Sequence, residues 1–167
     1  AELRHTILAE VVTNQAVKIV EFDLPVRDAA NPDYEAGVND WHDAIAAVWA
    51  QTLAAYGASR VALLVWGDPS LYDSTLRIAA RLQDVSVTVV PGITSLQVLT
   101  AAHAIPLNEI GQAVTITTGR QLQDGWPEVA QTLAVMLDGN CTFQTLDPTG
   151  ISIWWGAYVG MPEQIIM

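Results

Sequence analysis

Hydrophobic residues along the chain follow two patterns, a helical spacing of three or four positions and short continuous apolar runs. The helical spacing is clearest over 40–56, where Trp41 and Ile45 lie on one face. Asn39 precedes this stretch as the expected N-cap, and Gly57 follows it as the expected stop. Weaker helical patterns predict further helices at the start of the chain (3–11), over 70–82 and 94–104, and near 125–127.

Two continuous apolar runs, 61–66 and 85–90, are typical of strands that are covered on both faces of a parallel sheet. Further β-branched and apolar stretches predict strands over 17–22, 113–118, 133–137, 141–145 and 151–159, and an unfinished one over 164–167. Because strands and helices alternate along the chain, we expect an α/β fold with right-handed crossovers.

The organisation of the chain suggests two domains and an incomplete sequence. The alternating pattern breaks near Pro106, which predicts one domain over 1–106 and a second over 107–167. The chain opens at Ala1 inside a helical pattern and closes at Met167 inside an apolar run. We therefore expect a piece of a longer protein, or its ordered part.

Composition restricts the classes of partner. The 167 residues are 51% hydrophobic, enough to bury a substantial core. Acidic residues outnumber basic ones 18 to 7, and the formal charge of -11 disfavours nucleic acid as a partner. No apolar run approaches the ~20 residues that cross a bilayer, so no membrane association is expected. Cys141 is the single cysteine, which excludes an internal disulfide and suits a reducing cytoplasm.

Simple metal or hydrolase chemistry finds no support in the sequence. The three histidines, His5, His42 and His103, lie far apart, and a packed or solvated histidine explains each better than a metal ligand. HExxH, CxxC and GxSxG motifs are absent from the sequence. We therefore predict no metal site.

Two loops have the composition of ligand-binding turns at the carboxyl ends of parallel strands. In the first, Gly67 allows a close backbone approach and Asp68 can accept a hydrogen bond from a hydroxyl or an ammonium group. In the second, Thr94 and Ser95 follow Pro91-Gly92-Ile93 at the start of a predicted helix. An ordinary strand-to-helix turn would explain the first loop equally well, and helix capping alone would explain the second.

These two loops, a methionine at the end of a later strand, and the late segment 156–164 together resemble the tetrapyrrole methylase family. The resemblance implies two α/β domains with the active site in the cleft between them, and S-adenosylmethionine as cofactor. The first strand of that fold, with its glycine-rich loop, and the final strands are not in the chain. The resemblance implies that the cofactor is bound by Trp66, Gly67, Asp68, Leu71, Tyr72, Thr94, Ser95, Met136, Gly156 and Ala157.

Longer stretches resemble the members of that family that act in cobalamin biosynthesis on precorrin-5. They are 21–28, 41–47, 64–78 and 102–108. This resemblance implies methylation of the macrocycle at C-1 with release of acetate, by a cytoplasmic homodimer. Two alternatives stay open: a family member that acts on another precorrin or ring carbon, and a non-catalytic α/β module of the same fold.

The substrate implied by this resemblance carries many carboxylates, so local cations are needed in a strongly acidic protein. Arg27 and Arg120 follow predicted strands and are the expected substrate-binding residues, because arginine can hold a carboxylate through two parallel hydrogen bonds. Two solvated surface arginines are an equally good explanation. Removal of the acetyl group needs a proton acceptor, and the sequence does not choose among Asp23, Asp28 and Asp68.

Overall fold

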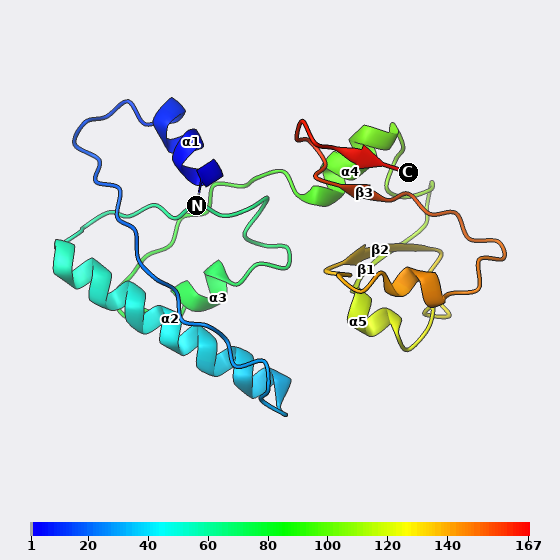
Figure 1. Ribbon diagram of the computed structural model, residues 1–167, viewed down its shortest axis with the longest axis horizontal. Coiled ribbons are helices and arrows are strands. Elements are labelled where there is room, and N and C mark those ends of the chain that lie inside the picture. Colours follow the sequence, from blue (N-terminus) through cyan, green and yellow to red (C-terminus); the bar gives the residue numbers. More distant parts are fainter. Residues whose placement is uncertain (1) are drawn as a thin grey trace. The chain divides into compact units, whose positions relative to one another are not determined.

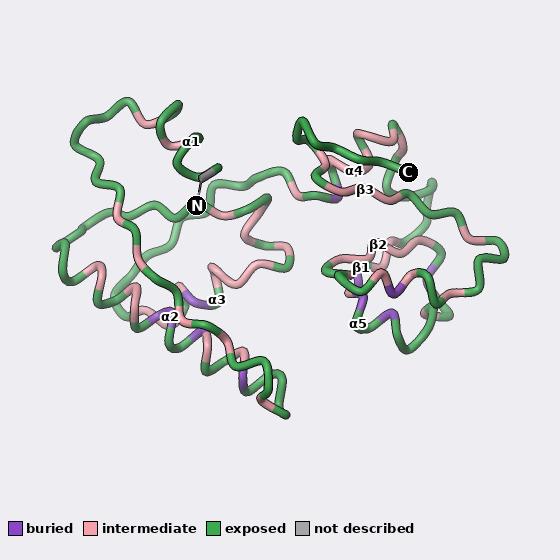
Figure 2. The backbone as a smooth tube through the Cα atoms, viewed as in Figure 1, coloured by how far each residue is buried: buried purple, intermediate pink, exposed green. Residues whose placement is uncertain are grey.

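The computed structural model describes residues 2–167, and its contacts divide the chain into two compact units, Ala1–Val90 and Pro91–Met167 (Figure 1). Buried residues lie in α2 and α3 of the first unit and around β1, β2 and α5 of the second (Figure 2). The domains 1–106 and 107–167 expected from the sequence stay a prediction.

The first unit is built around the long helix α2, Tyr34–Tyr56, with α1, Glu2–Val11, and the short α3, Thr75–Ala79. The helix predicted over 40–56 is confirmed, and Gly57 ends it in the left-handed conformation with φ 57°. The expected N-cap, Asn39, is wrong. Asp33 caps the helix instead, because its carboxylate accepts a hydrogen bond from the Ala36 N–H at 2.9 Å.

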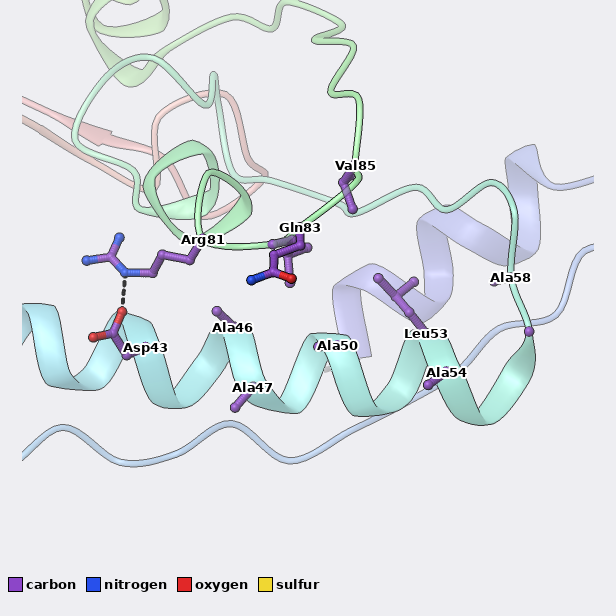
Figure 3. A pocket seen from close by; sticks show the side chains of 12 residues that line it. Asp43, Ala46, Ala47, Ala50, Leu53, Ala54, Ala58, Arg81, Gln83 and Val85 are labelled. Atoms are coloured by element: carbon purple, nitrogen blue, oxygen red, sulfur yellow. Dashed lines mark hydrogen bonds and ion pairs between the residues drawn. The ribbon is translucent and has the colours of Figure 1, made fainter.

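The core of the first unit lies between α2 and α3, where Ile45 and Ala46 meet Ile78. Arg81 joins the two helices from the edge of this core. Its Nε donates to Asp43 Oδ1 at 2.5 Å, as Figure 3 shows, and its NH2 group donates to Asn39 Oδ1 at 2.9 Å. Asn39 therefore contributes to helix packing rather than to capping.

His42 lies in this packed region as a neutral side chain. It is 2% exposed, and its Nε2 has no hydrogen-bond partner among the described residues. Burial, together with the guanidinium groups of Arg81 and Arg77, lowers the pKa of His42 below its ordinary value of 6.5, against an opposing effect from Asp43.

We expect the free energy of unfolding to fall between about pH 7.5 and about pH 5.5. The unfolded chain protonates His42 below pH 6.5, whereas the folded chain does so only at lower pH. The slope contributed by this one proton is at most about 1.4 kcal/mol per pH unit. Urea unfolding at the two pH values measures it, and His42→Gln should flatten the dependence. An equal pH dependence in both proteins would contradict the assignment.

Three strands predicted for the first unit are not formed. Residues 17–22, 61–66 and 85–90 run as irregular chain, without a ladder partner among the described residues. Most of their apolar side chains are exposed; Trp66 is 58% exposed and Val90 84%. A strand is stabilised by hydrogen bonds from a neighbour as well as by its own composition, so the apolar pattern alone could not fix these elements.

The helix predicted over 70–82 is shorter than expected, because α3 covers only Thr75–Ala79. Side chains of the preceding residues accept hydrogen bonds from backbone N–H groups that a longer helix would use. Asp68 Oδ1 accepts from Ser70 at 2.8 Å, and Asp73 Oδ1 accepts from Thr75 at 2.6 Å. Such local bonds compete with helix formation, so the helix begins only after Asp73.

The second unit contains helices α4, Ser95–His103, and α5, Gly119–Leu122, and two small sheets. In the first sheet, β1, Val114–Thr118, pairs in parallel with β2, Thr132–Met136, which confirms two predicted strands. In the second, β3, Gly156–Ala157, pairs antiparallel with β4, Ile165–Ile166. Leu122 and Ala134 are buried between α5 and the parallel strands.

Three predictions for the second unit are wrong. The expected strand 141–145 is a 3-10 helix over Thr142–Thr145, because the Asp138 carboxylate accepts from the Thr142 N–H at 2.8 Å and turns the chain. Of the strand expected over 151–159, only β3 is paired. The short helix expected near 125–127 is not formed, and the short helix of this region, α5, lies earlier, over Gly119–Leu122. The helix 94–104 is confirmed as α4.

Candidate functional site

The loop after Trp66 is held in shape by its own aspartate. Asp68 Oδ1 accepts from the Ser70 N–H at 2.8 Å and from the Ser70 hydroxyl at 2.5 Å. Gly67 has φ 66° and Tyr72 has φ 49°, so the backbone turns through the left-handed region twice. Trp66 is 58% exposed and Tyr72 40%, which leaves aromatic surface accessible at this loop. Leu71, which precedes Tyr72 in the sequence, is half-buried.

The loop before α4 is organised as a helix cap. The side-chain carbonyl of Gln97 accepts from the Thr94 N–H at 2.9 Å, and the Thr94 hydroxyl is hydrogen-bonded to the same oxygen. Thr94 therefore has the capping role that was one of its two explanations. Ser95 lies exposed in the first turn of the helix. Cofactor contacts from both residues stay a prediction.

Helix α4 also packs against the late segment. A Cβ atom on Gly156 would lie 2.7 Å from Leu99 Cδ1 of α4 and 2.6 Å from Val159 Cγ1. At the end of α4, His103 Nε2 lies 3.0 Å from the Trp155 carbonyl oxygen. Helix α4 thus begins at one predicted cofactor segment, Thr94 and Ser95, and packs beside another, Gly156 and Ala157 of β3.

The carboxyl edge of the β1–β2 sheet brings together two more predicted residues. Thr118 pairs with Met136 at the last position of the register, and Arg120 follows two residues after Thr118. Thr118 caps α5 by accepting from the Gln121 N–H at 3.3 Å. The resemblance implied that Met136 ends a strand, and the sequence placed Arg120 directly after one. The parallel pairing puts Met136 at the carboxyl edge of the sheet, where Arg120 follows in α5.

Gly119 and Asp138 meet at this same edge, and the sequence analysis missed both. Gly119 is buried, and a Cβ there would lie 2.7 Å from Asp138 Cα. Burial acts to raise the pKa of Asp138, but hydrogen bonds from Thr142 and Phe143 outweigh it and hold the pKa below the ordinary 3.8. Asp138 is therefore an ionised structural carboxylate that shapes the turn after β2.

The predicted substrate-binding arginines lie in different units. Arg27 is half-buried, and its guanidinium carbon lies 5.2 Å from the centroid of the Tyr34 ring at the start of α2. Arg120 is exposed in α5 of the second unit. Among the carboxylates considered for acetyl removal, Asp28 accepts from the Ala30 N–H at 2.8 Å, so it holds a local turn as Asp68 does.

Two hollows in the described part of the chain contain none of the predicted site residues. One of about 650 Å³ lies between α2 and residues 81–85 (Figure 3), and one of about 320 Å³ lies beside the 3-10 helix. The predicted cofactor residues are divided between the two units, so a cleft formed by both units stays a prediction. No three His, Cys, Asp or Glu side chains of residues 3–167 cluster as a metal site. No described helix combines the length and apolar character that crossing a membrane requires.

Comparison with known proteins gives consistent matches. The family model for tetrapyrrole (corrin/porphyrin) methylases matches residues 3–167. Precorrin-6A synthase [deacetylating] of Sinorhizobium sp is 44% identical over 176 residues, which cover 100% of this chain and 67% of that protein. A crystal structure of a cobalamin synthesis related protein (CobF) from Corynebacterium diphtheriae matches with a TM-score of 0.65 and 42% identity, over 80% of this chain and 59% of that one. The chain thus spans about three fifths to two thirds of these relatives.

Proposed function

The chain belongs to the tetrapyrrole (corrin/porphyrin) methylase family, and we propose that the protein transfers a methyl group from S-adenosylmethionine to C-1 of precorrin-5 and releases the acetyl group as acetate. The observation that carries this proposal is the 44% identity, along the whole chain, with a protein named precorrin-6A synthase [deacetylating]. The parallel β1–β2 pair and the helix α5 packed against it are consistent with the α/β fold of such an enzyme.

The residues at the predicted cofactor loops fit S-adenosylmethionine. Gly67, with its positive φ, allows the close backbone approach, and the exposed faces of Trp66 and Tyr72 offer stacking surface. In the second unit, Ser95 and Met136 lie at a helix start and at a strand end, the positions where ligands of α/β proteins bind. We assign the remaining cofactor contacts to Asp68, Leu71, Thr94, Gly156 and Ala157.

The chemistry assigns the protein a positioning role. When bound, the sulfonium supplies an activated methyl group, so the protein needs to align the ring carbon and exclude water. The Asp68 turn fixes the first loop, and the Gln97 cap fixes the second, so each loop is held in shape by its own hydrogen bonds. Arg27 and Arg120 bind carboxylates of the tetrapyrrole, and the protein acts as a cytoplasmic homodimer, as the resemblance implies.

The reaction is tested with the full-length protein, precorrin-5 and S-adenosylmethionine carrying a labelled methyl group. We expect equal amounts of S-adenosylhomocysteine and acetate, with the label on the ring, and no acetate without cofactor if methylation comes first. Mass spectrometry of the product and an acetate assay measure both steps. A methylated product that retains its acetyl group would assign the protein to another reaction of the family, and no methylation at all would favour a non-catalytic module.

A further inference from the structure

Helix α1 places a cation on the first predicted cofactor loop. The guanidinium carbon of Arg4 lies 5.3 Å from the centroid of the Trp66 ring, and Trp66 directly precedes Gly67. The next residue of the helix, His5, pairs through Nε2 with Glu21 Oε1 at 2.9 Å. The Arg4 contact thus joins α1 to the loop, and the His5 contact joins α1 to the segment around Glu21, although all three parts are distant in sequence.

The hydrogen-bond donors of Arg4 are available to a ligand. Attraction to a ring face uses the charge of a guanidinium, whereas its five N–H donors lie in its plane. Among residues 3–167, no carboxylate or carbonyl is paired with Arg4. Arg81, by comparison, donates to Asp43, to Asn39 and to the Arg77 carbonyl. Arg4 is therefore held by an aromatic face rather than by an anion.

We infer that Arg4 is a carboxylate-binding residue of the ligand site at the Trp66 loop, an inference that rests on the proposed function. A chain of formal charge -11 repels a polycarboxylate unless cations line its site. The indole face orients Arg4, and its planar N–H groups hold one carboxylate through two parallel bonds. Both the tetrapyrrole and the amino-acid part of the cofactor carry carboxylates. We expect the tetrapyrrole to be the source.

The experiment compares Arg4→Gln with Arg60→Gln in the full-length protein. Both variants remove one positive charge, and Arg60 is an exposed arginine at the other end of the apolar run that leads to Trp66. We expect Arg4→Gln to raise the KM for precorrin-5 about 10-fold or more, with kcat changed less. Arg4→Lys, which keeps the charge without the planar fork, should lie between Arg4→Gln and wild type. Arg60→Gln should leave the KM within about twofold.

Calorimetric titration with S-adenosylmethionine separates the two sources of the carboxylate. Unchanged cofactor affinity with a raised KM assigns Arg4 to the tetrapyrrole, and a matching loss of cofactor affinity assigns it to the cofactor. A lowered melting temperature in Arg4→Gln with both constants unchanged would overturn the inference, since Arg4 would then only anchor α1. Wild-type protein without methyl transfer would instead reject the proposed function, whatever the variants do.

Discussion

Gly119→Val should destabilise the second unit by about 3 kcal/mol or more, at the upper end of the cost of overpacking a buried site. Gly119 does not have a positive φ, so its lack of a side chain is required by space alone. A Cβ at this position would lie 2.6 Å from Asp138 Cγ and 2.7 Å from Asp138 Cα. Because the second atom belongs to the backbone, no rotation of the Asp138 side chain relieves the overlap.

The same substitution also displaces an anion from its donors. Asp138 accepts from the Thr142 N–H at 2.8 Å and from the Phe143 N–H at 3.3 Å, and these bonds shape the turn after β2. Pushing the carboxylate away leaves partly buried N–H groups without their partner, which adds to the steric cost. We therefore expect the whole carboxyl edge of the β1–β2 sheet to lose stability.

Amide hydrogen exchange of β1 and β2 measures this loss within the second unit. Gly139→Ala is the matched control, because Gly139 adjoins Asp138 and a Cβ there meets nothing within 4 Å. The control should exchange as the wild type does. Wild-type exchange in Gly119→Val would show that the backbone at Asp138 can move without cost, and equal acceleration in both variants would reject the steric explanation.

The sequence predicted those elements whose signals are local. Helix α2 has apolar residues at helical spacing and a glycine at its end, and α4 has a capping threonine, so both could be located from the sequence. The strands at β1 and β2 were also predicted from their composition, and they are confirmed because each finds its partner within the second unit. The run at 61–66 has an equally strong composition but no ladder partner in the described chain, and pairing is not encoded in a single segment.

Residues of the candidate site also differ in whether the sequence alone could identify them. Gly67 and Thr94 could be singled out because glycine and threonine have recognisable roles at turns and helix starts, and the structure gives both such a local role. The Arg4–Trp66 contact and the Gly119–Asp138 contact join residues that are distant in sequence and have no motif. Only the three-dimensional arrangement of the chain could have identified them.

Gly67→Val should weaken the binding of S-adenosylmethionine to the full-length protein at least about 10-fold, or about 1.4 kcal/mol. At φ 66°, Gly67 occupies the left-handed region, where a branched residue is strained by about 1–2 kcal/mol. Its side chain would also block the close approach of a ligand to the backbone between Trp66 and Asp68. Strain alone would lower stability, whereas obstruction lowers affinity, and the two effects can be separated.

Gly57→Val separates them, because Gly57 has φ 57° and a Cβ there meets nothing within 4 Å. The two variants carry similar backbone strain in the same unit, but Gly57 ends α2 and is not a predicted cofactor residue. Both should lower the melting temperature, and calorimetric titration should show reduced cofactor affinity in Gly67→Val alone. Wild-type affinity in both folded variants would remove this loop from the cofactor site. Equal losses would assign the effect to backbone strain, which acts on the unit as a whole.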